Sequence, residues 1–190
     1  MQGLTGTTFE AYSRMVNQER GFVYSTAATG VTLAALGTST APFLWNPADS
    51  GYNLVLTKCV LGYVSATNVA GHVNYGFQSN LGGAPGTGAP VVSLTQVAGR
   101  NLKIGSSVAS VMRFAPATVS LTAACTYLCP FGVSTAAMVA TTVAAPFTMV
   151  DDIDGRIIVM PGSAISIGAN ASIAVVASVA FYGFEIPIPG

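Results

Sequence analysis

The run Asn53–Tyr63, NLVLTKCVLGY, constrains this chain more than any other feature of its sequence. It follows a turn-rich block, NPADSG, and it is rich in residues that favour strands. A strand with one wet face alternates apolar and polar residues, but here only Lys58 interrupts the apolar character. Both faces are therefore expected to be covered by protein. Under strict alternation one face carries Leu54, Leu56, Lys58, Val60 and Gly62, and the other face carries Val55, Thr57, Cys59, Leu61 and Tyr63.

The last predicted strand, Ser172–Ile186, repeats this pattern. One face carries Ile173, Val175, Ala177, Val179 and Phe181. The second face carries Ala174, Val176, Ser178, Ala180, Tyr182 and Phe184. The second face mixes small side chains with larger ones, which permits close approach by another surface. The simplest explanation is a subunit interface over the outer sheet. The alternative is one large sandwich whose long loops fold over this face.

Composition indicates a protein that associates. The chain has 190 residues, which suits one domain. Only 7% of them are charged, against about 25% in an ordinary domain, and seven basic residues balance seven acidic ones. Because a neutral, charge-poor surface promotes association, we expect an oligomer or a larger assembly. No basic patch predicts nucleic-acid binding, and no apolar run reaches the roughly 18 residues of a membrane span.

The cellular compartment is predicted from two features. The N-terminus lacks the basic start and apolar core of a signal peptide. The cysteines, Cys59, Cys125 and Cys129, are odd in number, which argues against a disulfide framework. We therefore expect synthesis and folding in a reducing cytoplasm.

Two segments are expected along the chain. Residues 1–20 form either a short helix, since Phe9, Tyr12 and Val16 fall at helical spacing, or an extended arm ordered by a neighbour. Residues 21–190 form one β domain, because short runs rich in Val, Ile, Thr, Phe and Tyr alternate with Gly, Pro, Asn and Ser. Many short strands with regular turns predict an all-β, antiparallel jelly-roll sandwich.

The strand predictions are specific. They fall at Gly21–Thr26, Val31–Leu36, Pro42–Trp45, Asn53–Tyr63, Val73–Gln78, Val91–Gln96, Val108–Phe114, Thr118–Leu121, Thr126–Phe131, Phe147–Asp151, Arg156–Met160, Ala164–Gly168 and Ser172–Ile186. Ser79–Pro90 is expected to be a long surface loop. Residues 132–146 are rich in Ala and Thr and fit either helix or strand.

Few residues suggest chemistry. The one histidine, His72, lies in a turn-like context that supports no triad, so we interpret it as a solvated loop residue. Cys125 and Cys129 lack zinc-site spacing even with Cys59 and His72 added, and are interpreted as buried thiols. No catalytic, cofactor-binding or metal-ligating residue is predicted.

The sharpest polar cluster is Asp151, Asp152 and Asp154, in VDDIDGR. Calcium takes carboxylate and carbonyl oxygens, so a structural ion is one interpretation, although no Glu follows at the EF-hand distance. The favoured interpretation is a solvated turn between two strands, in which Gly155 supplies the bend and Arg156 an ion-pair partner.

The remaining candidates also favour structure over chemistry. Trp45, with Phe43 and Tyr52, is interpreted as a core anchor rather than as an aromatic shelf for sugar. The sequon Asn170–Ser172 has meaning only with a secretory route. An enzyme such as a glycan depolymerase needs paired carboxylates. The acids outside the Asp151–Asp154 cluster are scattered at Glu10, Glu19, Asp49 and Glu185, so we predict no enzyme.

Two blocks of sequence carry a resemblance. Residues 44–63, LWNPADSGYNLVLTKCVLGY, resemble the NP-x-x-SG-x-x-L-x-L block of jelly-roll proteins encoded by tailed bacteriophages. Residues 154–189 resemble their closing block: a Gly-initiated strand, a Pro-Gly turn, a short strand, and a long strand ending in Glu-x-Pro. In such proteins the jelly roll is similar to the trimeric tumour-necrosis-factor-like fold.

The resemblance implies a structural virion protein. We expect a homotrimeric capsid decoration or cement protein on the capsid surface, bound over junctions of the major capsid protein, with residues 1–20 as arms. The alternative is a head- or tail-fibre module that binds host receptor glycan through loops such as Ser79–Pro90. That loop has no charged or aromatic residue, which favours adhesion. No cofactor is expected.

Overall fold

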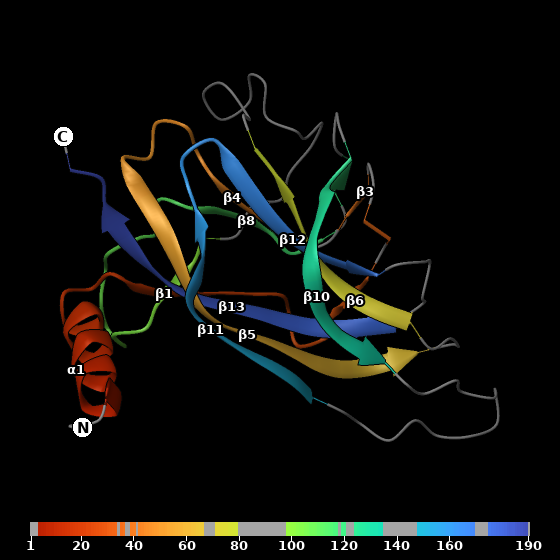
Figure 1. Ribbon diagram of the computed structural model, residues 1–190, viewed down its shortest axis with the longest axis horizontal. Helices are drawn as coiled ribbons and strands as arrows, with labels where there is room; N and C mark the ends of the chain where they lie inside the picture. The colour runs from red at the N-terminus through yellow and green to blue at the C-terminus, as the bar shows by residue number, and fades with distance from the viewer. Residues whose placement is uncertain are drawn as a thin grey trace.

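The computed structural model describes residues 4–33, 35–36, 39–40, 42–66, 71–79, 98–117, 119–120, 124–134, 148–169 and 175–189. They form two packed antiparallel sheets with a helix, α1, at one end (Figure 1). The predicted all-β, antiparallel sandwich is therefore confirmed. No helix in the described part of the chain is long and apolar enough to cross a membrane.

The sheets differ in how their strands are ordered. Sheet A runs β11-β5-β13-β1-β7, with β2 added to β13, and sheet B runs β10-β6-β12-β4-β8. Sheet A contains β1 (Gly21–Ser25), β2 (Val31–Thr32), β5 (Tyr52–Ala66), β7 (Arg100–Asn101), β11 (Thr148–Val159) and β13 (Val175–Pro187). Sheet B contains β4 (Phe43–Asn46), β6 (Gly71–Gln78), β8 (Arg113–Ala115), β10 (Thr126–Ser134) and β12 (Ser163–Ala169). A separate small pair consists of β3 (Ser39–Thr40) and β9 (Val119–Ser120).

The pairing is nested. Among β1, β4, β5, β6, β10, β11, β12 and β13, the first strand pairs with the last, the second with the seventh, the third with the sixth and the fourth with the fifth. Two further pairings, β5 with β13 and β6 with β12, join these hairpins into sheets. The long edge strands β10 and β11 consequently lie on the same side of the sandwich. The opposite edges, β7 and β8, are only 2 and 3 residues long.

A β-bulge at Thr57 changes the faces of β5 from those predicted. Lys58 lies opposite Asp152 of β11 and Tyr182 of β13, but the next pair on each side uses Leu56, so Thr57 is an extra residue. Because side chains alternate with period two, one extra residue moves all that follow to the other face. The predicted faces are therefore wrong beyond the bulge. The inner face consists of Leu54, Leu56, Cys59 and Leu61, all fully buried.

The outer face of sheet A is half-buried. On β5 it carries Val55, Lys58, Val60 and Gly62. On β13 the predicted alternation is confirmed, because Val175, Ala177, Val179 and Phe181 are buried whereas Val176, Ser178, Ala180 and Tyr182 are half-buried. The face is thus apolar or small in its centre, and its charged residues lie toward the edges. Lys58 pairs with Asp152 toward β11, and Arg100 lies on β7.

The N-terminal segment is a helix, α1 (Leu4–Asn17), rather than an extended arm. It covers one end of the outer face of sheet A, where the Tyr12 ring lies 5.3 Å from the Phe184 ring between centroids. Glu19 takes a left-handed φ of 61°, which turns the chain from the helix into β1. The Lys103 ammonium pairs with the Glu19 carboxylate at 3.1 Å and fixes this junction.

Several predicted strands need correction. The predictions at Val31–Leu36 and Val108–Phe114 are too long, since the described strands there are only Val31–Thr32 and Arg113–Ala115, with one isolated bridge at Ala35. The short strands β3 and β7 have no signal in the sequence pattern. The predictions at Val91–Gln96, for residues 135–146 and for most of Ser79–Pro90 lie outside the described residues.

Candidate functional site

The candidate site begins at an irregularity in β11. Asp152 pairs with Lys58 and Ile157 pairs with Leu56, so residues 153–156 lie opposite Thr57 alone and bulge out of the ladder. The predicted strands Phe147–Asp151 and Arg156–Met160 are therefore one strand, and the predicted turn between two strands is wrong. The prediction that Gly155 supplies the bend is confirmed, because it takes a φ of 80° after Asp154 at 50°.

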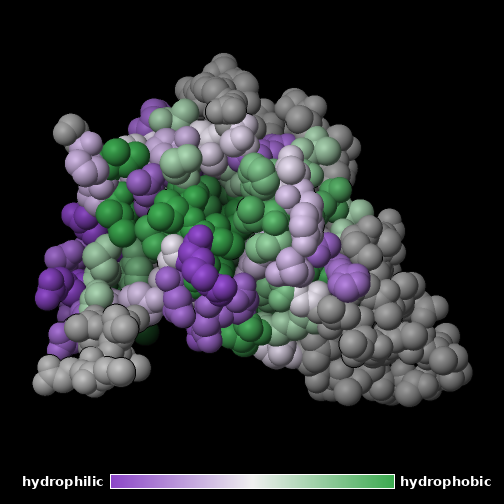
Figure 2. Space-filling model, viewed as in Figure 1, coloured by the Kyte–Doolittle hydropathy of each residue, from purple (hydrophilic) through white to green (hydrophobic). Residues whose placement is uncertain are grey.

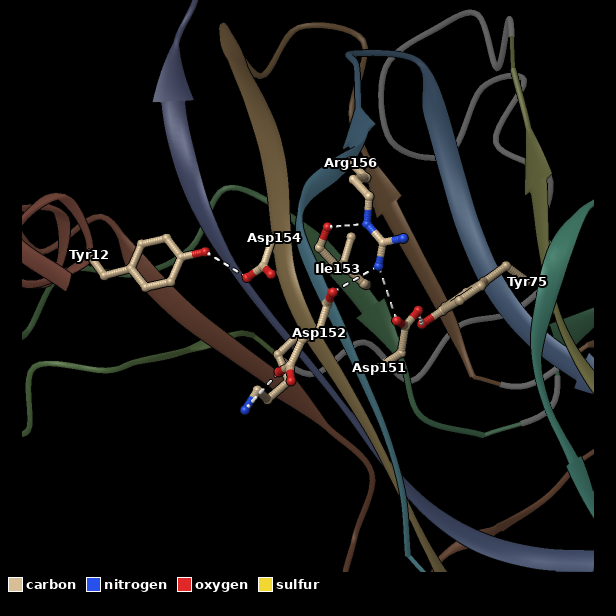
Figure 3. A network of polar contacts seen from close by, with 8 residues as sticks. Tyr12, Tyr75, Asp151, Asp152, Ile153, Asp154 and Arg156 are labelled. Carbon is tan, nitrogen blue, oxygen red and sulfur yellow. Dashed lines mark hydrogen bonds and ion pairs between the residues drawn. The ribbon is translucent and has the colours of Figure 1, made fainter. Parts of the chain in front are cut away.

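Arg156 closes the bulge. Its Nε donates to the Ile153 carbonyl (2.9 Å), and its Nη2 donates to the Asp152 carbonyl (2.8 Å) and lies 3.3 Å from Asp151 Oδ1 (Figure 3). The predicted ion-pair role of Arg156 is thus confirmed. Ile153 itself points into the core and is 1% exposed. The guanidinium and this anchor hold the four bulged residues in one conformation.

The three carboxylates have three different partners. Asp151 Oδ2 accepts from Tyr75 Oη (3.0 Å), Asp152 pairs with Lys58 Nζ (3.0 Å), and Asp154 Oδ1 accepts from Tyr12 Oη (3.2 Å) (Figure 3). The described residues include no group of three His, Cys, Asp or Glu that could hold a metal ion. The cluster therefore serves as a junction, at which the bulge joins sheet B through Tyr75 and α1 through Tyr12.

Tyr75 is the link between the two sheets at this edge. It stands on β6 of sheet B, is fully buried, and packs edge-on against Phe131 with ring centroids 5.3 Å apart. Burial, and then the proximity of the ionisable Cys59 thiol and of the Asp151 carboxylate, raise the pKa of the Tyr75 hydroxyl, so it stays a donor to Asp151. Burial likewise raises the pKa of the Cys59 thiol, which faces the same hydroxyl from sheet A.

An apolar groove lies beside the bulge, between β11 and the strands β10, β6 and β12. Its volume is about 720 Å³. Three of its apolar side chains are unusually exposed: Leu128 (42%), Ile158 (53%) and Met160 (60%). The charged residues among its described lining are Asp151 and Arg156, which are bonded to each other. Figure 2 shows apolar side chains gathered on this side of the molecule, next to a compact hydrophilic group.

A second polar centre, near the C-terminal end of β13 in the middle of sheet A, was not predicted. Glu185 is 4% exposed, and its Oε1 accepts from Tyr24 Oη (2.8 Å) and from Ser110 Oγ (2.5 Å). Its Oε2 accepts from the Val111 amide (3.3 Å). The signal in the sequence was available, because Glu185 continues the inward-facing series of Val179 and Phe181 in a strand whose inner face is otherwise apolar.

The residues singled out for chemistry are dispersed. His72 is exposed on strand β6, not in a loop as predicted. Cys59 lies in the main core, Cys125 in a second cluster with Trp45, and Cys129 is half-buried in the groove. Burial raises the pKa of the Cys125 thiol to about 11. The buried-thiol interpretation is thus confirmed for Cys125, whereas it is wrong for Cys129, which is half-buried.

Trp45 is the core anchor that the sequence predicts. It is 2% exposed and packs with Phe43, Ala115 and Ala164. Because both Trp45 and Phe43 are buried, the sugar-binding shelf is excluded. The sequon Asn170–Ser172 lies outside the described residues.

Comparison of this chain with protein-family models, with curated proteins and with solved structures finds no match. The site must therefore be interpreted from its own geometry. In it the charged groups bind one another, and the surface that remains is apolar. Such an arrangement binds other apolar surface.

Proposed function

We propose that this chain is a structural virion protein, the jelly-roll subunit of a homotrimer that decorates a bacteriophage capsid. The nested strand order supports the jelly roll, because an antiparallel hairpin of eight strands rolled into two sheets has this order. The resemblance of residues 44–63 and 154–189 to phage jelly-roll proteins supports the virion role.

The outer face of sheet A carries the proposal. It is wide and half-exposed, and its centre consists of Val60, Gly62, Ser178 and Ala180. Such a face suits a close contact with protein, since apolar surface removed from water contributes about 25 cal/mol per Å². Because α1 packs on its own sheet, we place the contacts on the sandwich rather than on an extended N-terminal arm.

Stabilisation of the shell would follow from mass action. A trimer that binds the assembled shell, and not its separated subunits, raises the free energy needed to pull those subunits apart. No bond is made or broken in this role, so it needs neither a cofactor nor a catalytic residue.

The copy number of the chain in purified virions tests the proposal. Quantitative mass spectrometry should give a number comparable to that of the major capsid protein. A handful of copies per particle would instead support the fibre module, and absence from virions would overturn the virion role. Light scattering should give the mass of a trimer, whereas a monomer at all concentrations would contradict the homotrimer.

A further inference from the structure

The two edges of sheet A present opposite charges in the same register. One row of paired residues crosses the sheet from β11 to β7: Asp152, Lys58, Tyr182, Val23 and Arg100. It begins with a carboxylate at one edge and ends with a guanidinium at the other. Because β11 and β7 are the two outermost strands and paired residues share a face, both charges lie on the outer face of sheet A, one at each edge.

The adjacent row ends in apolar side chains at both edges. It runs from Ile158 through Val55 and Phe184 to Gly21, whose carbonyl accepts from the Leu102 amide (2.8 Å). Ile158 is half-exposed at the groove, and Leu102 begins the turn that follows β7. At each edge of sheet A, the row that ends in a charged residue is therefore followed by a row that ends at an apolar element.

The apolar element after β7 is a projecting knob. Ile104 is 99% exposed at the tip of a turn closed by the Ser106 amide and the Lys103 carbonyl (3.0 Å). Gly105 takes a φ of 92° and completes the turn. A β-branched side chain held in water on a well-defined turn is suited to fill a hollow on another molecule.

The apolar element at β11 is such a hollow. The groove has a volume of about 720 Å³, and it exposes Leu128, Ile158 and Met160. The charges around the two elements are complementary. The groove has one net negative charge, because its surroundings contain Asp151, Asp152 and Asp154 but only Lys58 and Arg156 as cations. The knob has one net positive charge, from Arg100 and Lys103 against Glu19.

We propose that copies of this chain associate head to tail, with the Ile104 turn of one copy in the β10/β11 groove of the next and Arg100 facing Asp152. The contact is heterologous, so it closes into a ring when the rotation between copies fits. It rests on the proposed homo-oligomer and specifies how that oligomer is built.

A native thiol allows a direct test by cross-linking. Cys129 lines the groove and is half-buried, whereas Cys59 and Cys125 are buried. The full-length Ile104→Cys variant, treated with a short bis-maleimide, should give covalent dimers and higher species on a denaturing gel. The double variant Ile104→Cys/Cys129→Ser should give none. Cross-links that persist in the double variant would mean a knob-to-knob contact and would overturn the proposal.

Association in solution gives the second test. Ile104→Asp should weaken self-association about tenfold or more by sedimentation, because it places a charge in an apolar groove. Val64→Asp is the matched control, since Val64 is an exposed valine (41%) away from both elements, and it should change association less than about twofold. Arg100→Asp should also weaken association, and Arg100→Asp/Asp152→Arg should restore it.

These outcomes separate the contact from the function on which it rests. An oligomer that is insensitive to Ile104→Asp would overturn the head-to-tail contact and leave the homotrimer standing. A wild-type monomer at all concentrations would overturn both. The virion copy number tests the decoration role independently of either result.

Discussion

Asp151 and Glu185 each accept a hydrogen bond from a buried tyrosine, but they do so in different surroundings. Asp151 lies at the open edge beside the groove, where its side chain is 29% exposed and Arg156 lies within 3.3 Å. Glu185 lies on the inner face of sheet A near the end of β13, is 4% exposed, and takes part in none of the ion pairs among the described residues. Glu185 is held instead by three neutral donors, Tyr24, Ser110 and Val111.

This difference shows two ways to keep a carboxylate in a charge-poor protein. At the open edge a cation and water share the solvation of Asp151, so the hydrogen bond from Tyr75 is one contribution among several. At the buried Glu185 the donors replace water altogether, and they also fix the segment containing Ser110 to the end of β13. The Glu185 site should therefore respond to mutation far more strongly than the open edge.

The largest effect is expected for Glu185→Leu. This change leaves the hydroxyls of Tyr24 and Ser110 buried without their acceptor, and should lower the free energy of unfolding by about 4 kcal/mol in urea denaturation. Glu185→Gln keeps one acceptor oxygen and should cost less. Glu10→Leu, at an exposed helix position, is the control and should stay within about 0.5 kcal/mol. Equal effects at positions 10 and 185 would contradict the comparison.

Alkaline pH should have the next largest effect. Burial is the main cause that raises the pKa of Cys59, of Cys125 (to about 11), of Tyr24 and of Tyr75. As pH rises past the ordinary values of 9.0 and 10.0, these groups ionise in the unfolded chain but stay neutral in the folded one. These groups contribute their full share to the free energy of unfolding below those pH values. About 3 kcal/mol of that free energy should be lost between about pH 8 and 10.

Unfolding by urea at a series of pH values measures this loss. Tyr75→Phe and Cys125→Ala should each make the stability curve flatter above about pH 9, because each removes one titrating group. A wild-type stability that stays constant to pH 10 would show that these groups are not buried as described.

A smaller effect is expected at the open edge. A double-mutant cycle of Asp151→Asn and Tyr75→Phe should give a coupling energy of about 1 kcal/mol, since Arg156 and water remain to solvate the carboxylate. The matching cycle of Glu185→Gln and Tyr24→Phe should give a larger value. A larger coupling at the open edge would reverse the comparison.

The smallest effect is expected for the ion pair on the outer face of sheet A. The side chains of Lys58 and Asp152 are 45% and 61% exposed, so solvent screens their attraction. Lys58→Ala should change the free energy of unfolding by about 0.5 kcal/mol or less in the isolated protein. A much greater loss would mean that this pair is covered in solution, which an oligomer of the proposed kind would explain.

Local patterns predicted what depends on local physics. The alternation of β13, the burial of Trp45 and the bend at Gly155 each follow from a few neighbouring residues. The Thr57 bulge does not, because an extra residue in a ladder is defined only by the partner strands, and these come from positions 148–159 and 175–187. Strict alternation therefore failed at this one residue and mis-assigned all that followed.

The polar centres were missed for a related reason. Tyr24 and Glu185 are 161 positions apart in the chain, and Tyr75 and Asp151 are 76 apart. No spacing rule connects such residues, and the nested strand order alone brings them together. In the sequence Glu185 was one of several scattered acids, although its place in an inward-facing series marked it as buried.

The bulge in β11 has a consequence for engineering. Residues 153–156 lie outside the ladder, which resumes on either side at Asp152 and Ile157. A peptide inserted between Asp154 and Gly155 would lengthen a segment that already has no strand partner, and would leave both flanking registers unchanged. Such an insertion would stand on the rim of the groove, where a displayed epitope would also report whether that rim is accessible in an assembled particle.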